Sequence, residues 1–245
     1  MAIKGILFDL YGTLIDIETD ESMEEIYRGI AHFLTYQGIY LNRWELRDLY
    51  YQIMRQQKGG SMEEFPEIDV EAIWKSFLKQ QGIRSPYARI RLSKILAQMY
   101  RGISRKRLKL YPFVNEALDE LVSSYKLGLV SDAQTCYALP EIRAMGLTDY
   151  FDPVIISVDY GFRKPDPRLF LKAMEKMSIT PQEAVFVGND IYRDIYGAGM
   201  VGMMTILFDS KQGTETSEDI TPDYTVTGFS DVLSVIRDAE NISML

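Results

Sequence analysis

Four short polar clusters along the chain contain side chains whose types could carry out hydrolytic chemistry. Asp9 belongs to the first cluster, Ser131 and Asp132 form the second, Lys164 lies in the third, and residues 188–194 make up the fourth. A carboxylate can act as a nucleophile, and a lysine can neutralise the negative charge that develops during a reaction. Carboxylates are also the oxygen ligands that Mg²⁺ prefers. The residue types are therefore compatible with nucleophilic catalysis and with metal binding.

The elements that would position these clusters follow from the pattern of apolar residues. The apolar run 3–8 ends at Asp9 and is typical of a buried strand. From residue 110 onward, short apolar strands alternate with helices, which predicts an α/β fold with a doubly wound parallel sheet. Ligands of such sheets bind beyond the carboxyl ends of the strands, so we expect all four clusters on one edge. The predicted strands are 126–130, 154–158, 184–187, 203–208 and 223–226, and the predicted helices are 114–121, 139–145, 168–177, 191–197 and 232–239.

The segment between the first strand and the rest has a different pattern. Four groups of apolar residues recur there at helical spacing, with no strand pattern between them. One parallel strand cannot stand alone, so the first strand must join the later sheet and the helical segment must be an insertion. We therefore predict an α/β core from residues 1–16 and 108–245 and an all-helical cap from residues 17–107. The four groups begin at Ile26, Leu46, Ile73 and Ile90.

In this order, and with a helical insertion after the first, the clusters resemble the four motifs of the haloacid dehalogenase-like superfamily. The resemblance covers essentially the whole chain and implies a Rossmann-like core with a helical cap. It implies that Asp9 is a nucleophile that forms a covalent intermediate. Ser131, Asp132 and Lys164 would contact the substrate. The candidate catalytic residues on this basis are Asp9, Tyr11, Thr13, Ser131 and Lys164.

The resemblance also implies a Mg²⁺ site between the first and fourth clusters. Its ligands would be Asp9, the backbone carbonyl of Tyr11, Asp190 and Asp194. The superfamily separates its two acids by three or four residues. Asp190 and Asp194 fit the shorter spacing, whereas the longer spacing would make Asn189 the first ligand. The sequence leaves open which of Asn189 and Asp190 faces the metal.

Tyr11 is the main departure from the phosphatases of this superfamily. Their second acid protonates the leaving alcohol and later activates water, and Tyr11 stands in its place. A tyrosine with a pKa near 10 is a poor base. The 2-haloacid dehalogenases share this Asp-x-Tyr-Gly-Thr motif, and a halide leaves without a proton. In those enzymes an asparagine stands where this chain has Asp132, and a second anion there would repel a carboxylate substrate.

These observations leave three hypotheses. The leading one is Mg²⁺-dependent hydrolysis of a small phosphorylated metabolite through an Asp9 intermediate. The alternative is a metal-independent 2-haloacid dehalogenase, and the third is a catalytically poor binding or regulatory protein on the same fold. A dehalogenase also needs a cap arginine for the substrate carboxylate, and Arg43, Arg47 and Arg55 are candidates.

Composition limits the partners of the protein. The chain has 27 basic and 35 acidic residues and a net charge of −8, which disfavours nucleic acid and anionic membranes as partners. The single cysteine, Cys136, excludes an intrachain disulfide and fits a reducing compartment. We find no signal-peptide pattern and no apolar stretch near the roughly 20 residues of a membrane span. We therefore expect a cytoplasmic protein that acts on a small molecule, and its oligomeric state is not indicated.

Overall fold

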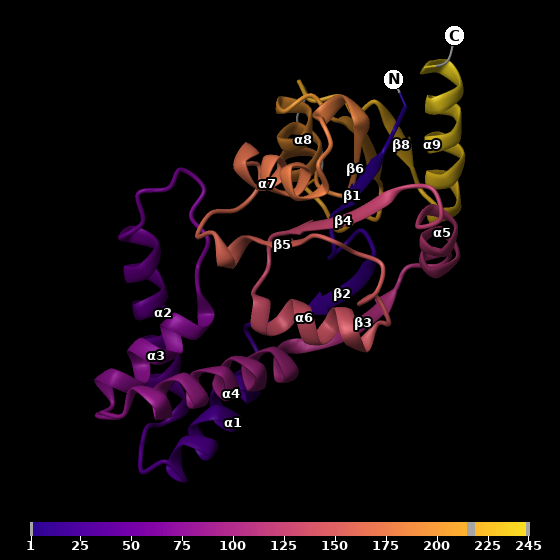
Figure 1. The fold of residues 1–245 in the computed structure, drawn as a ribbon. Coiled ribbons are helices and arrows are strands. Elements are labelled where there is room, and N and C mark those ends of the chain that lie inside the picture. The colour runs from indigo at the N-terminus through magenta and orange to yellow at the C-terminus, as the bar shows by residue number, and fades with distance from the viewer. Residues whose placement is uncertain (1, 215–218, 244–245) are drawn as a thin grey trace.

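A central parallel sheet organises the chain in the computed structural model, which describes residues 2–214 and 219–243 (Figure 1). Its strand order is β5-β4-β1-β6-β7-β8, and every neighbouring pair is parallel. The first strand lies inside the sheet and later strands extend it on both sides, which confirms the doubly wound α/β core. The strands are β1 (Gly5–Phe8), β4 (Lys126–Ser131), β5 (Val154–Ile156), β6 (Ala184–Gly188), β7 (Met204–Phe208) and β8 (Tyr224–Val226).

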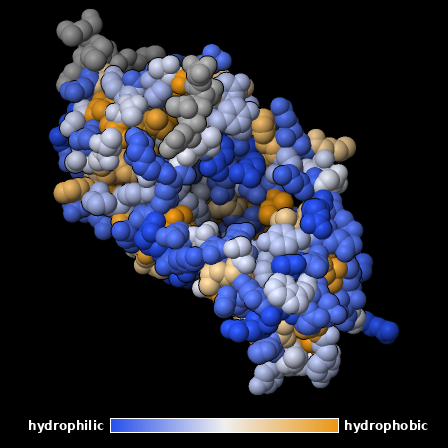
Figure 2. All heavy atoms as spheres, turned by 180° about the vertical axis from the view of Figure 1, so that it is seen from behind, coloured by the Kyte–Doolittle hydropathy of each residue, from blue (hydrophilic) through white to orange (hydrophobic). Residues whose placement is uncertain are grey.

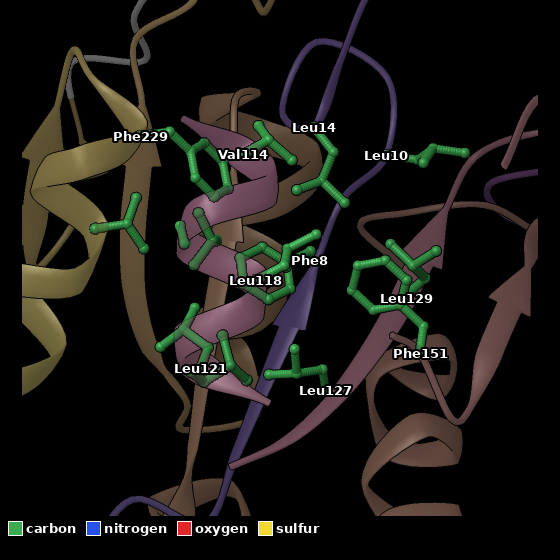
Figure 3. Packing of buried hydrophobic residues seen from close by; sticks show 14 of the residues in the cluster. Phe8, Leu10, Leu14, Val114, Leu118, Leu121, Leu127, Leu129, Phe151 and Phe229 are labelled. Carbon is green, nitrogen blue, oxygen red and sulfur yellow. The ribbon is translucent and has the colours of Figure 1, made fainter. Parts of the chain in front are cut away.

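Helices cover both faces of the sheet because its central strands are apolar on both sides. Phe8 packs on one face against Leu118 and Phe229 (Figure 3), whereas Leu7 packs on the other face against Phe170. This alternation is the period of two that a strand imposes on its side chains. The helices of the core are α5 (Val114–Leu121), α6 (Thr135–Ala144), α7 (Pro167–Met177), α8 (Gly197–Met200) and α9 (Phe229–Ser243), with a π-helical segment at Ile191–Tyr196.

The four helices expected in the insertion are present and form a hydrophobic cluster of their own. Trp74, Phe77 and Leu34 are completely buried in this cluster, and the helices lie together at one end of the molecule (Figure 1). Side-chain caps mark where three of them begin: Asn42 makes a capping box, and Asp69 and Ser85 cap the last two helices. They are α1 (Glu24–Thr35), α2 (Arg43–Gly59), α3 (Val70–Gln80) and α4 (Pro86–Ser104).

An antiparallel ribbon that the sequence pattern did not predict joins the insertion to the core. Strands β2 (Ile15–Thr19) and β3 (Arg105–Leu110) pair there, so the predicted boundaries at 16/17 and 107/108 fall within strands. Arg107 forms ion pairs across the ribbon with Asp16 and Glu18, at 2.9 and 2.6 Å. Charge pairs of this kind stabilise one face of the ribbon. On the other face, Ile15, Ile17, Leu108 and Leu110 pack against the core cluster. The apolar alternation covers only a few residues on each strand, which explains why the sequence pattern did not reveal it.

Several predicted elements also have different bounds, among them the last helix, which runs from Phe229 to Ser243 and not from 232 to 239. The strand expected at 154–158 ends at Ile156, because a 3₁₀ turn begins at Ser157. The Oγ of Ser157 accepts a hydrogen bond from the backbone N–H of Ala133, which holds this turn against the end of β4. The helix expected at 139–145 begins four residues earlier, at Thr135.

Candidate active site

The four polar clusters meet at the carboxyl ends of β1, β4 and β6, as expected for this type of sheet. A cavity of about 490 Å³ lies at this edge. The molecular surface is hollowed between the core and the four helices of the insertion, with hydrophilic residues around the hollow (Figure 2). Residues of all four clusters line the cavity, and they are Asp9, Tyr11, Ser131, Asp132, Lys164, Asn189, Arg193 and Asp194.

Lys164 joins the first and fourth clusters at the bottom of the cavity. Its Nζ donates to Asp9 Oδ1 at 2.7 Å, to Asp194 Oδ1 at 2.6 Å and to the carbonyl of Val130 at 3.1 Å. Lys164 and both carboxylates are buried. Burial raises the pKa of Asp9 to about 6, with Lys164 opposing the shift and Asp194 reinforcing it. Burial lowers the pKa of Lys164, but the negative charges of Asp194 and Asp9 raise it by more. The net effect is a raised pKa, so the Lys164 side chain stays protonated.

Thr13 and Ser131 supply hydroxyl groups beside Asp9. The Oγ1 of the buried Thr13 lies 3.3 Å from both Asp9 Oδ2 and Asn189 Oδ1. Gly12 permits this approach, because its φ is +86° and a Cβ there would lie 2.3 Å from the Asn189 amide nitrogen. The Oγ of Ser131 is buried without a hydrogen-bond partner among the described residues. A substrate oxygen could satisfy it.

Asp132 lines the cavity, but its carboxylate also holds the segment that carries Lys164. Its Oδ1 accepts from the backbone N–H of Lys164 at 2.9 Å, and its Oδ2 lies 3.5 Å from Arg163 and 3.9 Å from Arg193. Burial raises the pKa of Asp132 against the effect of these cations. The geometry therefore gives Asp132 a positioning role, and its direct contact with substrate stays a prediction.

The two acids of the fourth cluster have different surroundings. Asp194 faces Lys164 with one oxygen, and its other oxygen accepts backbone N–H bonds from Asn189 and Asp190, both at 3.0 Å. Asp190 instead caps the π-helical segment, and its carboxylate also accepts from Arg193 Nη2 at 2.8 Å and from Thr214 Oγ1 at 2.7 Å. Among the described residues that line the cavity, Asn189 is present and Asp190 is not.

The donor atoms around the cavity fit a small hard cation. Within residues 2–214 and 219–243, no three acidic, histidine or cysteine side chains gather as a metal cluster. The cavity does offer carboxylate oxygens from Asp9 and Asp194 and a carboxamide oxygen from Asn189, which are ligands that suit Mg²⁺ with several retained waters. Gly188 leaves room for this arrangement, because a Cβ there would lie 2.5 Å from Asp194.

Comparison with known proteins places this geometry in a family. A family profile described as haloacid dehalogenase-like hydrolase matches residues 3–202. The chain belongs to the haloacid dehalogenase-like hydrolases. It is 25% identical to a glyceraldehyde 3-phosphate phosphatase of Methanocaldococcus jannaschii, over 96% of this chain and 97% of that one. It is 27% identical to an enzyme of the same name from Methanopyrus kandleri, over 96% of this chain and 98% of that one.

A solved structure is also similar. The 2-haloacid dehalogenase of Pseudomonas syringae pv. Tomato superimposes with a TM-score of 0.69 at 22% identity, over 97% of this chain and 99% of that one. At this identity the similarity describes the fold that both proteins share. In the described part of the chain, no helix is both long and apolar enough to span a bilayer.

Tyr11 is where this haloacid dehalogenase-like chain differs most from a simple two-acid site. Its hydroxyl donates a hydrogen bond to Glu141, and Arg101 binds the same carboxylate through Nε and Nη2, both at 2.9 Å. Arg105 adds a third contact at 3.0 Å. Burial and the Glu141 carboxylate raise the pKa of Tyr11. Although burial opposes them, the hydrogen bonds from Arg101 lower the pKa of Glu141, so the shared proton stays on Tyr11.

A second cavity of about 310 Å³ adjoins the first, between the core and the insertion. The two cavities share Tyr11, Ile17, Thr19 and Asp132. Its other walls come from α2, α3, α4, α6 and the loops beside them. The described residues that line this second cavity but not the first include Tyr50, Glu67, Tyr100, Arg101, Gln134, Tyr137 and Arg163.

The cap arginines that the sequence suggested do not line either cavity. Arg43 pairs with Glu24, Arg47 pairs with Asp48, and Arg55 lines a separate surface pocket. Arg101 and Arg163 line the second cavity instead. Sequence reasoning missed Arg101 because helical periodicity does not show which turn of α4 faces the core. It missed Arg163 because this residue lies in a loop, where no periodic pattern indicates its direction.

The loop between α2 and α3 docks directly on the core beside Lys164. Within this loop, the backbone N–H of Glu67 donates to Gly161 at 3.1 Å, and the carbonyl of Phe65 accepts from Arg163 at 2.9 Å. The side chain of Gln134 donates to the carbonyl of Ile68 at 2.6 Å and accepts from Val70 N–H at 2.9 Å. These contacts seal one wall of the second cavity.

Proposed function

We propose that this haloacid dehalogenase-like hydrolase removes the phosphoryl group from a small phosphorylated metabolite, with Mg²⁺ as cofactor. The observation that carries the proposal is Lys164 held between the buried carboxylates of Asp9 and Asp194, with Asn189 beside them. The described residues that line the cavity include four acids and three cations, so a divalent cation is needed for a phosphate dianion to enter. The relatives named as glyceraldehyde 3-phosphate phosphatases support the same reaction class.

The side chains divide the reaction between them. An oxygen of Asp9 bonds to phosphorus while the bond to the leaving oxygen breaks, and the leaving oxygen takes a proton from water. Ser131 donates to a phosphoryl oxygen, and Lys164 neutralises the charge that builds up on Asp9 and the phosphoryl group. Water then attacks phosphorus, which releases phosphate and frees Asp9. Asp9, the Tyr11 carbonyl, Asn189 and Asp194 would hold Mg²⁺, which would supply further charge neutralisation when bound.

A 2-haloacid dehalogenase is the second candidate, and the position of Tyr11 favours it. The Tyr11 hydroxyl is bound to Glu141 and carries a raised pKa, so it is a poor proton donor for a leaving alcohol. A halide leaving group needs no proton. A protein with little catalytic activity on the same fold is the remaining alternative.

Activity measurements with and without Mg²⁺ test these candidates. We expect hydrolysis of alkyl and aryl phosphates that disappears with EDTA and with Asp9→Asn, and no release of halide from 2-haloacids. Halide release that is insensitive to EDTA would contradict the proposal and support the dehalogenase. Absence of turnover on both panels would support a binding or regulatory protein.

We further propose that α1–α4 act as a cap that closes over the site through the β2–β3 ribbon. The separate hydrophobic cluster of these helices and the polar docking of the α2–α3 loop support this view. The cytoplasmic location and the absence of nucleic-acid and membrane partners stay predictions from composition.

A further inference from the structure

We propose that Arg101 and Tyr137 determine specificity by binding an oxygen-bearing group on the leaving part of the substrate, an inference that rests on the phosphatase function proposed above. Both residues line the second cavity, which opens beside the nucleophile through the shared residues Tyr11 and Asp132. A phosphoryl group on Asp9 would therefore direct its leaving alcohol toward them. The substrate class that fits is a small phosphomonoester with a hydroxylated or carbonyl-bearing leaving group.

The hydroxyl of Tyr137 is the first observation. Its Oη is buried and has no hydrogen-bond partner among the described residues, although Tyr137 lies in a wall of the cavity. A buried hydroxyl without a partner costs free energy, and native proteins rarely leave one unsatisfied. A ligand oxygen in the cavity would satisfy it, as would a water that the ligand displaces.

Arg101 is the second observation, because its guanidinium is fixed before any ligand arrives. Glu141 accepts two of its five N–H donors, which leaves others for an acceptor in the cavity. The rings of Tyr11 and Tyr137 lie on the guanidinium at 5.2 and 5.3 Å from its central carbon. A preorganised donor loses little conformational entropy when it binds an oxygen.

The charges around this group favour an electron-rich ligand atom near Arg101. Glu141 carries one negative charge and binds two guanidiniums, those of Arg101 and Arg105, so the cluster keeps one net positive charge. Elsewhere in the wall, Glu21 and Glu67 present carboxylates, which accept hydrogen bonds from hydroxyl groups. A leaving group with several hydroxyl or carbonyl oxygens can accept hydrogen bonds from Arg101, and its hydroxyl groups can donate them to the carboxylates. An alkyl chain can do neither.

The size of the cavity limits the leaving group. One water occupies about 30 Å³ in the liquid, so a cavity of about 310 Å³ takes on the order of ten heavy atoms. A short polyol or hydroxy-aldehyde has a size that this cavity accommodates.

Glycerol 1-phosphate and n-propyl phosphate test the inference, since they share a three-carbon chain and differ only in two hydroxyl groups. The measured quantity is the ratio of kcat/KM for glycerol phosphate to that for propyl phosphate. We expect the wild-type ratio to exceed ten, Tyr137→Phe to lower it about tenfold, and Arg101→Lys to lower it by about 10–100-fold. The exposed Tyr40, which lines neither cavity, gives the matched control Tyr40→Phe, which should keep the wild-type ratio.

Thermal melting separates recognition from a structural role. Tyr137→Phe removes a hydroxyl without a partner, so its melting temperature should equal or exceed that of the wild type. A wild-type ratio near one, or ratios for Tyr137→Phe and Arg101→Lys within twofold of the wild type, would overturn the inference while leaving the phosphatase function intact. Failure of the wild-type protein to hydrolyse either phosphate would overturn the proposed function itself.

Discussion

Tyr11 and Glu141 are 130 residues apart in the sequence, and the hydroxyl of Tyr11 donates a hydrogen bond to the Glu141 carboxylate. Glu141 lies on α6 of the core and also binds Arg101 on α4 of the insertion. The side chain that replaces the second acid of related phosphatases is therefore held by both parts of the molecule. This arrangement removes Tyr11 from proton transfer and makes it part of the contact between core and insertion.

Restoring the missing acid should change the leaving-group dependence of the reaction. General acid catalysis contributes about 10²–10⁴-fold, mainly for leaving groups that need protonation. We expect Tyr11→Asp to raise the ratio of the alkyl phosphate rate to the aryl phosphate rate. Tyr11→Asn, whose new side chain has the shape of aspartate but cannot donate an acidic proton, should keep the wild-type ratio. Steady-state rates on both ester types provide the measurement. An unchanged ratio in Tyr11→Asp together with lost haloacid turnover would favour the dehalogenase hypothesis.

Replacing Glu141 should destabilise the protein more than replacing an exposed acid. Glu141 is 4% exposed, and its removal leaves two guanidiniums without their carboxylate. Breaking a buried ion pair from one side typically costs about 3–5 kcal/mol, whereas exposed pairs contribute about 0–1 kcal/mol. We expect Glu141→Gln to lower the free energy of unfolding by about 3 kcal/mol, measured in urea. Asp48→Asn, which removes the exposed partner of Arg47, is the control and should change it little. Equal effects of the two variants would refute the structural importance of Glu141.

Asp9→Asn should abolish turnover without harming the fold. Loss of a covalent nucleophile should reduce kcat by at least about 10³-fold. Burial raises the pKa of Asp9 to about 6. At pH 7.5 the carboxylate is ionised, and its ionisation lowers the free energy of unfolding of the metal-free protein. The melting temperature of metal-free Asp9→Asn should therefore match or exceed that of the wild type. Substantial residual activity would remove Asp9 from the nucleophile role.

Three substitutions in the fourth cluster should separate metal binding from helix capping. Asp194→Asn should weaken Mg²⁺ binding, and Asn189→Asp should strengthen it about tenfold because it adds a carboxylate to the cavity. Asp190→Asn should lower the melting temperature, because Asp190 caps the π-helical segment and contacts Arg193 and Thr214. Its effect on Mg²⁺ affinity should be smaller than that of Asp194→Asn. Calorimetric titration with Mg²⁺ gives all three affinities. A larger loss in Asp190→Asn than in Asp194→Asn would make Asp190 the metal ligand.

Gln134→Ala should loosen the α2–α3 loop from the core. Gln134 makes two hydrogen bonds to this loop, and the substitution leaves the backbone groups of Ile68 and Val70 without that partner. We expect faster hydrogen exchange in residues 61–70 and a higher KM, because loop closure completes the wall of the second cavity. Gln98→Ala, on α4 and outside this cavity, is the control. Unchanged exchange in residues 61–70 would show that Gln134 does not hold the loop.

The sequence by itself determined the parallel sheet, the four insertion helices and the residues that meet at the site. Apolar runs, helical spacing and turn residues are local properties, and they act over a few positions. The parallel order of the strands then brings Asp9, Ser131, Lys164 and Asp194 to one edge whatever their separation in the chain. This is why the core of the candidate site could be predicted without coordinates.

Only the tertiary structure decided which side chains face one another across elements. It showed that Asn189 rather than Asp190 lines the cavity, and that Arg101 rather than Arg43 reaches it. The partnership of Tyr11 with Glu141 is of the same kind. Such contacts depend on the rotation of a helix about its axis and on the packing of one element against another. Many packings are compatible with one hydrophobic pattern, so the pattern alone cannot distinguish them.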